Sequence, residues 1–161
     1  MPHSSSPHVI GLVSDTHGLL RPSVHQALEG VEMILHAGDV GGYDVLHELA
    51  TMAPVHAVAG NTDPVGDPAL PESVDMSVGG KRIHLSHGHE TGRPTPEKLL
   101  AAYDADIVVY GHTHVPVIFE SQGRLVVNPG AAGPLRFKLR PSVARLTIAN
   151  GLAEVAIVEI D

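Results

Sequence analysis

Short apolar runs alternate with polar, glycine-containing segments along most of the chain. Runs of this length, rich in valine, isoleucine and leucine and bounded by polar turns, are typical of buried β-strands. Five of them are followed within a few residues by a histidine, an aspartate or an asparagine. These are Val9–Val13 before Asp15 and His17, Met33–Leu35 before His36 and Asp39, Val55–Ala59 before Asn61 and Asp63, Arg82–Ser86 before His87 and His89, and Ile107–Tyr110 before His112 and His114.

Helical patterns separate the first three predicted strands. A helix is predicted at about Pro22 to Glu29, because proline suits the first helical turn and Gly30 follows the last. A second helix is predicted at about Tyr43 to Thr51. Short strands that alternate with helices indicate βαβ units and a parallel sheet. The inner positions expected on the second helix are Tyr43, Leu46, His47, Leu49 and Ala50.

From residue 73 onward the pattern favours paired strands. Gly79 and Gly80 separate the alternating segment Ser73–Val78 from Lys81–Ser86, which is a hairpin signal. One more helix is predicted from Pro96, with Thr95 as its N-cap, to about Tyr103. Two later hairpins are predicted, around Ser121-Gln122-Gly123 between Val117–Glu120 and Arg124–Asn128, and around Asn150-Gly151 between Ser142–Ile148 and Ala153–Ile160. These hairpins indicate a second sheet or a mixed edge.

The polar residues at the strand ends are suited to metal binding. In open α/β sheets, ligands bind outside the carboxyl ends of the strands. Imidazole, carboxylate and amide groups are nitrogen and oxygen ligands for metal ions. His112 and His114 are two residues apart, and on an extended segment such residues point to the same side. This pair alone is weak evidence, because the chain has 12 histidines and two polar residues in a turn look the same.

The composition is typical of one globular domain. The length of 161 residues fits a single domain, residues 1–161, with residues 1–7 as a flexible tail. The hydrophobic fraction of 43% suffices for an aliphatic core, and the absence of cysteine excludes disulfides and thiolate ligands. No apolar run approaches the roughly 20 residues of a membrane span. The first residues lack the features of a secretory signal, so no membrane association and a cytoplasmic location are expected.

Charge is distributed unevenly along the chain. Residues 1–80 contain one basic and ten acidic residues, and residues 81–161 contain nine basic and eight acidic ones, which gives the net charge of −8. The acidic half argues against binding of a nucleic-acid polymer, whose phosphate backbone requires lysine and arginine. Arg136, Lys138, Arg140 and Arg145 form a basic region. They could be solvated charges at a strand edge, or Arg136 could reach a substrate phosphate.

Five motifs occur in order: Asp15-Thr16-His17, Gly38-Asp39, Gly60-Asn61-Thr62-Asp63, His87-Gly88-His89 and Gly111-His112-Thr113-His114. As an ordered set they resemble the calcineurin-like metallophosphoesterase superfamily. The short length and Asn128-Pro129-Gly130 are similar to its small YfcE-like phosphodiesterases, and the retromer scaffold Vps29 shares their fold. The resemblance covers about Val9 to Arg136. It implies an α/β fold, a four-layer αββα sandwich of two mixed β-sheets flanked by helices.

The resemblance also implies two divalent metal ions. The ligands implied for the first ion are Asp15, His17, Asp39 and His114, and those for the second are Asp39, Asn61, His87 and His112, with Asp39 as the bridge. Nitrogen and oxygen ligands of these types suit Mn, Fe, Zn, Co or Ni better than Ca or Mg. The family favours Mn²⁺. All seven positions carry competent ligands, which favours an enzyme.

The implied reaction is hydrolysis of a phosphodiester by attack of a metal-bound hydroxide. Catalytic roles are expected for Asp39, Asn61, His89 and Asp63, and substrate contacts for Asn61, His89 and Arg136. The implied substrate is a small phosphate ester, and a homo-oligomer is compatible with the sequence. Two alternatives remain open. One is a phosphomonoesterase or nucleotidase with the same chemistry, and the other is a Vps29-like scaffold without catalysis.

Two positions depart from the family pattern. Many members have a histidine after Gly-Asn that donates a proton to the leaving group, whereas this chain has Thr62. Many YfcE-like members have serine after Asn-Pro-Gly, whereas this chain has Ala131. The identity of the general acid is therefore the part of the implied mechanism that the sequence leaves open.

Overall fold

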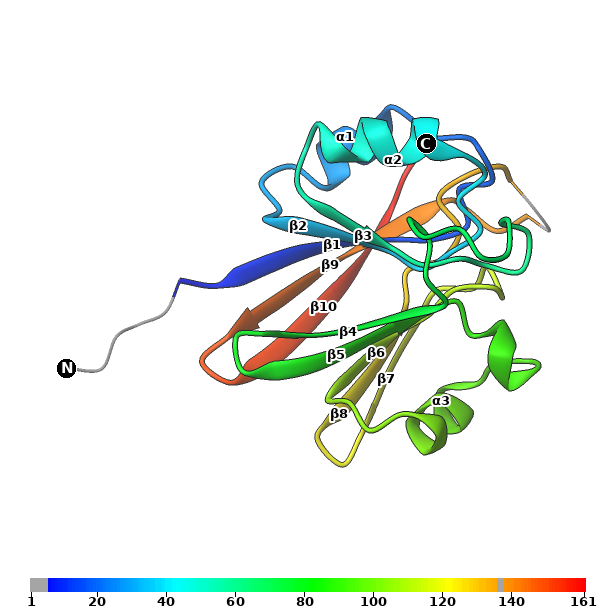
Figure 1. Ribbon diagram of the computed structural model, residues 1–161. Coiled ribbons are helices and arrows are strands. Elements are labelled where there is room, and N and C mark those ends of the chain that lie inside the picture. The colour runs from blue at the N-terminus through cyan, green and yellow to red at the C-terminus, as the bar shows by residue number, and fades with distance from the viewer. Residues whose placement is uncertain (1–5, 136–137) are drawn as a thin grey trace.

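The computed structural model describes residues 6–135 and 138–161, and it contains two β-sheets with helices outside them (Figure 1). The strands are β1 (His8–Val13), β2 (Met33–His36), β3 (Val55–Ala57), β4 (Ser73–Val78), β5 (Lys81–Ser86), β6 (Ile107–Val109), β7 (Val117–Ser121), β8 (Arg124–Asn128), β9 (Ser142–Ala149) and β10 (Leu152–Glu159). The helices are α1 (Ser23–Ala27), α2 (Tyr43–Ala50), α3 (Pro96–Ala102) and the one-turn 3₁₀ helix η1 (His89–Thr91).

Both sheets combine parallel with antiparallel pairing. The first has the strand order β10-β9-β1-β2-β3, in which β1, β2 and β3 are parallel and β9 is antiparallel to β1 and β10. The second has the order β4-β5-β6-β8-β7, with β5, β6 and β8 parallel and antiparallel strands at both edges. The hairpins expected from residue 73 onward therefore belong to two mixed sheets.

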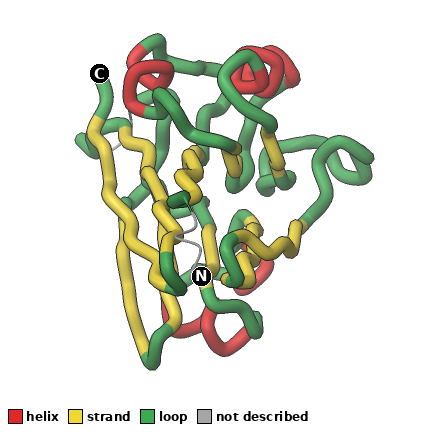
Figure 2. The backbone as a smooth tube through the Cα atoms, turned by 90° about the vertical axis from the view of Figure 1, so that its left-hand side faces the viewer, coloured by secondary structure: helices red, strands yellow, loops and turns green. Residues whose placement is uncertain are grey.

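Three hydrophobic clusters hold the layers together. Leu12 of β1 and Leu85 of β5 belong to the cluster between the two sheets. Leu49 of α2 packs in a second cluster on the outer face of the first sheet, and Leu99 of α3 packs in a third on the outer face of the second sheet. Figure 2 shows the helices outside two groups of strands. This arrangement confirms the expected four-layer αββα sandwich.

The apolar runs are continuous because the central strands are covered on both faces. Side chains alternate between faces along a strand. In the segment that forms β6, Ile107 and Val109 enter the cluster between the sheets, whereas Val108 and Tyr110 enter the cluster beneath α3. All four are at most 1% exposed. A strand buried on both faces reads as an unbroken hydrophobic run.

Two predicted hairpins are closed by two-residue turns with left-handed backbone. Gln122 and Gly123, with φ of 50° and 77°, connect β7 to β8. Asn150 and Gly151, with φ of 53° and 75°, connect β9 to β10. Positive φ at both central residues is the type I′ geometry that matches the twist of the flanking strands. The turn signals in the sequence are therefore confirmed.

The ends of two helices follow from their local sequence. The hydroxyl of Thr95 accepts a hydrogen bond from the Lys98 N–H at 3.2 Å, which confirms the predicted N-cap of α3. Helix α1 is shorter than expected. Its C-cap Leu28 leaves the helical conformation (φ −108°, ψ 19°), and its side chain packs against Gly11 of β1.

The expected inner face of α2 was partly wrong. Val45 and Leu49 are the buried residues of this helix, whereas Tyr43, His47 and Ala50 are exposed. Val45 and Leu49 are four residues apart and lie on one stripe of the helix. The eight-residue helix therefore faces the sheet with a stripe narrower than its sequence suggested.

Two predictions fall partly or wholly on residues outside the described part. Residues 1–5 of the predicted tail are among them, whereas Ser6 and Pro7 are exposed and irregular. Arg136, a predicted substrate contact, also lies outside the described residues. Within residues 6–135 and 138–161, no helix has the length and apolar character that a membrane crossing requires.

Candidate metal centre

The segments that follow β1, β2, β3, β5 and β6 come together at one end of the sandwich, on the right in Figure 1. The strands β1, β2 and β3 run parallel in the first sheet, and β5 and β6 run parallel in the second, so the carboxyl ends in each sheet meet at one edge. The first sheet positions Asp15, His17, Asp39 and Asn61, and the second positions His87, His112 and His114. The candidate site therefore lies where the two sheets meet.

The two carboxylate oxygens of Asp15 have different surroundings. Oδ2 accepts hydrogen bonds from the Ser14 hydroxyl at 2.6 Å and the His112 N–H at 3.1 Å. Oδ1 is fully buried and has no hydrogen-bond partner. A buried oxygen without a donor is costly unless another group satisfies it. Oδ1 is thus available as a metal ligand.

Asp39 is arranged in the same way. Its Oδ1 accepts a hydrogen bond from the Thr62 N–H at 3.0 Å, while Oδ2 lies 3.3 Å from His87 Nε2 and 3.7 Å from His17 Nε2. The Nδ1–H of His87 donates to the Ala37 carbonyl at 2.7 Å. This bond fixes the tautomer, so that the lone pair of His87 Nε2 faces the site.

Two groups of ligand atoms result, and they adjoin at Asp39. In the first, Asp15 Oδ1 lies 3.7 Å from His17 Nε2 and 3.3 Å from His114 Nε2. In the second, His112 Nδ1 lies 3.1 Å from Asn61 Oδ1 and 3.3 Å from His87 Nε2. Asp39 Oδ2 approaches His17 of the first group and His87 of the second. The structure thus brings together the residues that the sequence suggested for each ion.

The predicted geometry of His112 and His114 was wrong. Their φ values are 72° and 66°, so the segment is not extended and the two side chains do not share one side of a strand. Instead, His112 turns toward Asn61 and His87, while His114 turns toward Asp15. The left-handed turns therefore deliver one histidine to each group.

The ligand segments carry most of the strained backbone. Eight non-glycine residues in the described part of the chain have positive φ. Five of them are predicted metal ligands, namely Asp15, His17, Asp39, His112 and His114. Such conformations cost on the order of 1–3 kcal/mol each and concentrate at functional sites. The gathering of these residues at one end of the sandwich supports a functional assignment.

Two glycines allow the ligand segments to approach one another. A Cβ atom at Gly60 would collide with the Asp39 carboxylate, and one at Gly111 would collide with the Ser14 hydroxyl and Asp15 Oδ2. The glycines beside the polar strand ends are therefore required for close packing of the candidate ligands.

The charged groups of the site stabilise one another. Burial raises the pKa of the Asp15 carboxyl group, but His114, His17 and His87 around it hold that pKa well below its usual range. Burial also raises the pKa of Asp39, but His87 and the Thr62 N–H lower it to about 2. Both carboxylates are ionised near neutral pH and supply the negative charge that divalent cations require.

The other predicted catalytic residues lie near these groups. The His89 ring centroid is 5.3 Å from that of His87 and 6.2 Å from that of His112. The Asp63 carboxylate is buried and accepts N–H groups of Val40, Gly41 and Gly60 at 2.9–3.2 Å. Asp63 therefore fixes the segments that carry Asp39 and Asn61.

Several residues that support the ligands were missed by sequence reasoning. Asn128 is fully buried and donates to the Gly111 carbonyl at 3.1 Å and the Thr113 hydroxyl at 3.0 Å. The Thr16 hydroxyl, 3.0 Å from His36 Nε2, donates to the Val40 carbonyl at 2.7 Å. Their positions were the available signal, because Thr16 lies between two predicted ligands and Asn128 ends β8, the strand that pairs with β6.

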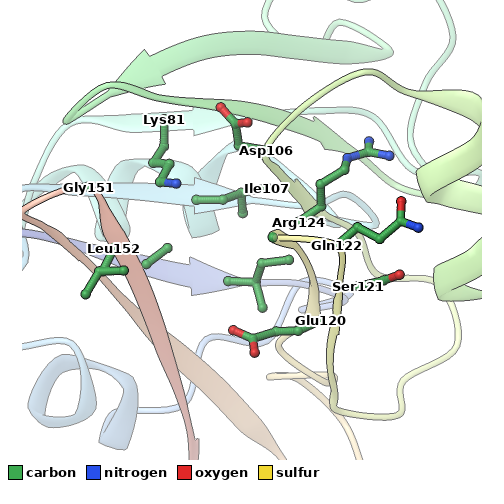
Figure 3. Close-up of a pocket in the computed structure, with 12 residues that line it drawn as sticks. Lys81, Asp106, Ile107, Glu120, Ser121, Gln122, Arg124, Gly151 and Leu152 are labelled. Carbon is green, nitrogen blue, oxygen red and sulfur yellow. The ribbon is translucent and has the colours of Figure 1, made fainter.

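A hollow of about 340 Å³ lies away from these ligands (Figure 3). Its lining comes from the starts of β5, β6, β8 and β10, from the end of β7, and from the β7–β8 and β9–β10 turns, and includes Lys81, Ile107, Glu120 and Leu152. None of the predicted metal ligands lines it. It is therefore a separate feature of the surface.

The burial, hydrogen bonding and spacing of the candidate ligand atoms fit the binding of divalent ions. Among the described residues, Asp15 Oδ1 and His17 Nε2 are buried atoms of the first group that have no hydrogen-bond partners. Two compact sets of ligand atoms occur, Asp15 with His17 and His114, and Asp15 with Asp39 and His87. A shared set of carboxylate and imidazole groups suits a transition-metal centre.

Comparisons with known proteins point the same way. The profile of the calcineurin-like phosphoesterase superfamily domain matches residues 9–151. The chain is 37% identical over 147 residues to a probable metallophosphoesterase of Methanothermobacter thermautotrophicus, covering 86% of this chain and 80% of that protein. It is 29% identical over 139 residues to a phosphodiesterase of Methanocaldococcus jannaschii, covering 75% and 82%.

The fold has solved counterparts as well. The structure of vacuolar protein sorting 29 from Cryptosporidium parvum matches with a TM-score of 0.80 at 24% identity, and the match covers 96% of this chain and 98% of that chain. At this identity the likeness shows the fold alone. Since the family profile matches nearly the whole chain, ligand segments included, the protein belongs to the calcineurin-like phosphoesterase superfamily.

Proposed function

We propose that this protein is a two-metal phosphodiesterase. One ion would be held by Asp15, His17 and His114, the other by Asn61, His87 and His112, and Asp39 would bind both. The observation that carries the proposal is the position of Asp39 Oδ2, which lies within 3.7 Å of His17 Nε2 and 3.3 Å of His87 Nε2 while Oδ1 is bound to the protein.

The protein's own groups prepare the site for phosphoryl chemistry. When bound, two divalent ions supply Lewis-acid stabilisation of phosphoryl oxygens and a hydroxide nucleophile near neutral pH. Asp15 and Asp39 balance part of the cationic charge and leave a net positive site that attracts a phosphate ester. Asn61, a member of the second group, and His89, which lies beside that group, are the proposed contacts to substrate oxygens. Asp63 positions Asp39 and Asn61 through backbone hydrogen bonds.

A diester is the proposed substrate class, and manganese the proposed metal. The Methanocaldococcus jannaschii relative is a phosphodiesterase, which supports the first choice. The histidine, carboxylate and amide ligands support a first-row transition metal over calcium or magnesium. Fe, Zn, Co and Ni are also compatible with these ligands. Cytoplasmic location, homo-oligomerisation and lack of affinity for nucleic-acid polymers stay predictions from the sequence.

A scaffold function is the alternative that the shared fold leaves open. The structural likeness to vacuolar protein sorting 29 extends over nearly the entire chain. A scaffold, however, does not require seven ligand-competent side chains, five of them on strained backbone, or buried ligand atoms without hydrogen-bond partners. These features support catalysis over a purely structural role.

The deciding experiment is an activity screen of the metal-reconstituted protein. The purified chain is stripped with a chelator, reloaded separately with Mn²⁺, Zn²⁺, Co²⁺ and Ni²⁺, and assayed on phosphodiesters, phosphomonoesters and cyclic nucleotides. Metal-dependent diester hydrolysis that disappears in His114→Ala is expected. Monoester hydrolysis alone would favour the phosphomonoesterase, and no hydrolysis by any loaded form would contradict catalysis.

A further inference from the structure

A second polar cluster lies on the outer face of the second sheet, between β5, η1 and α3. The Tyr103 hydroxyl, at the end of α3, donates to Glu90 Oε2 at 2.6 Å. The other oxygen of this carboxylate, Oε1, accepts the N–H of Gly88 at 3.0 Å. Glu90 therefore connects the end of α3 to the backbone of Gly88, the residue between His87 and His89.

Tyr103 is itself held firmly. Its ring stacks on that of His84 with a centroid distance of 3.7 Å and an interplanar angle of 20°. His84, on β5, lies with Nδ1 2.8 Å from an Asp75 carboxylate oxygen on β4. The Arg124 guanidinium binds the carbonyls of Leu100, Tyr103 and Ala105, so the end of α3 is fixed to β8. The sheet thus provides a rigid support for the Tyr103 hydroxyl.

The other end of this chain of contacts reaches the metal centre. Gly88 has φ of 102°, and it is packed against Pro94 and Tyr110. His87 has its own restraint, the hydrogen bond to the Ala37 carbonyl. The His89 side chain is 39% exposed and lies beside His87 and His112. His89 Nδ1 also lies 4.0 Å from Glu90 Oε1. Because His87 is held by its own hydrogen bond, Glu90 is placed to affect the position of His89 more than that of His87.

We propose that Glu90, braced by Tyr103, is a positioning residue that holds His89 against the substrate side of the metal centre. The contacts that carry this inference are the two hydrogen bonds of the Glu90 carboxylate, one to Tyr103 and one to Gly88. The inference rests on the proposed phosphodiesterase function, in which His89 contacts the substrate. Glu90 touches neither the substrate nor the ions and acts through the conformation of residues 88–89.

A double-mutant cycle tests this role. Glu90→Ala should lower kcat/KM for an aryl phosphodiester about 10-fold, in the range found for residues that orient metal-site groups. His89→Ala should lower it by at least as much, and adding Glu90→Ala to His89→Ala should cause no further loss. Glu90→Gln retains an acceptor for Gly88 and a partner for Tyr103, so it should recover most of the activity.

Two further variants separate positioning from folding. Tyr103→Phe keeps the ring stacked on His84 but removes the hydroxyl, and it should reproduce part of the Glu90→Ala effect. The matched control is Tyr43→Phe, which removes a tyrosine–carboxylate hydrogen bond to Asp67 in a different loop and should leave kcat/KM unchanged. Metal content measured by elemental analysis should stay at two ions in every variant, because Ala37 continues to orient His87.

The outcomes are distinguishable. Additive losses from Glu90→Ala and His89→Ala, or loss of an ion in Glu90→Ala, would overturn the proposed action through His89. The same four proteins of the cycle are also titrated with inorganic phosphate in the Mn²⁺-loaded form, where the same non-additivity is expected. A wild type that binds phosphate but hydrolyses no ester would contradict the proposed function while the phosphate cycle still decides the role of Glu90. A wild type that does neither would contradict both.

Discussion

Asp15 and Asp39 show how single residues are fitted to metal binding, because in each one oxygen is fixed by protein donors and the other is directed into the site. Asp39→Asn should weaken both ions, since the neutral amide loses the charge that the two groups of ligands share. Elemental analysis after dialysis measures the loss, and the exposed Asp44→Asn is the matched control. Retention of two ions at wild-type affinity would contradict the bridging assignment.

His36 makes stability depend on pH. The single proton of the Thr16 hydroxyl goes to the Val40 carbonyl, so the Thr16 oxygen accepts from His36 Nε2–H, and His36 Nδ1 accepts the Gly38 N–H at 3.1 Å. The imidazole is therefore neutral in the fold. Burial, only partly opposed by Asp15 and Asp63, lowers its pKa from 6.5 to about 4.

The sign of this linkage is clear, because the unfolded chain binds the proton more tightly than the folded one. The contribution of His36 to the free energy of unfolding is fully present above pH 6.5. It is lost as the pH falls toward 4, by roughly 3 kcal/mol in total. Denaturant unfolding of the metal-free protein at several pH values should show that His36→Gln loses less stability over this window than wild type. The surface variant His25→Gln should behave as wild type. Equal losses in wild type and His36→Gln would rule out this role.

Thr62 stands where many relatives have the histidine that protonates the leaving group. A threonine hydroxyl cannot act as an acid near neutral pH, and general acid catalysis contributes about 10²–10⁴-fold. Diesters with strongly basic leaving groups should therefore react slowly, and Thr62→His should accelerate them selectively. Rates across a series of leaving-group pKa values measure this, with Thr51→His at the end of α2 as a control for added histidine. A shallow dependence in wild type would mean that another group donates the proton.

At the scale of elements, the patterns that repeat along the backbone were the predictable ones. Strands buried on both faces, the N-cap at Thr95 and the Asn150-Gly151 turn follow from local rules and are confirmed. The turn at His112 and His114 was not predictable in this way. Its left-handed residues are held in place by a side chain from a neighbouring strand, Asn128, and by the Asp15 carboxylate. Such long-range contacts override local preference, and no spacing of residues reveals them.

Asn128 holds the turn that carries His112 and His114. Its amide donates to Gly111 and Thr113, and its Oδ1 accepts the Gly130 N–H at 2.9 Å. Asn128→Ala should release the turn and weaken metal binding about 10-fold, which metal titration of the stripped protein measures. Asn150→Gly removes an amide from a turn at the other end of the sandwich and keeps its positive φ, so it should change nothing. Unchanged metal affinity in Asn128→Ala would show that the turn is held by other contacts.

In the whole molecule, each proposed ion takes ligands from both sheets. Asp15, His17, Asp39 and Asn61 belong to segments that follow strands of the first sheet, and His87, His112 and His114 to segments that follow strands of the second. The hydrophobic cluster between the sheets packs the two sheets together along their strands. The ions would connect the two sheets a second time, at the carboxyl ends of those strands. Periodicity predicted a parallel sheet followed by paired strands, and the family resemblance implied two facing sheets, but the way the sheets share one site emerges only when they are packed.

Removal of the ions should therefore destabilise the molecule as a unit. An ion that binds only the folded state adds about 2.7 kcal/mol at a concentration 100 times its Kd. For a chain of this size, each kcal/mol shifts Tm by about 2–4 °C. Chelation should thus lower Tm by roughly 5–10 °C per site, less whatever the groups that stabilise the Asp15 and Asp39 carboxylates recover in the metal-free state. Calorimetry with and without chelator measures the shift, and Asp39→Asn should show little of it. An unchanged Tm after confirmed metal loss would mean that the inter-sheet core alone sets the stability and that the ions serve catalysis only.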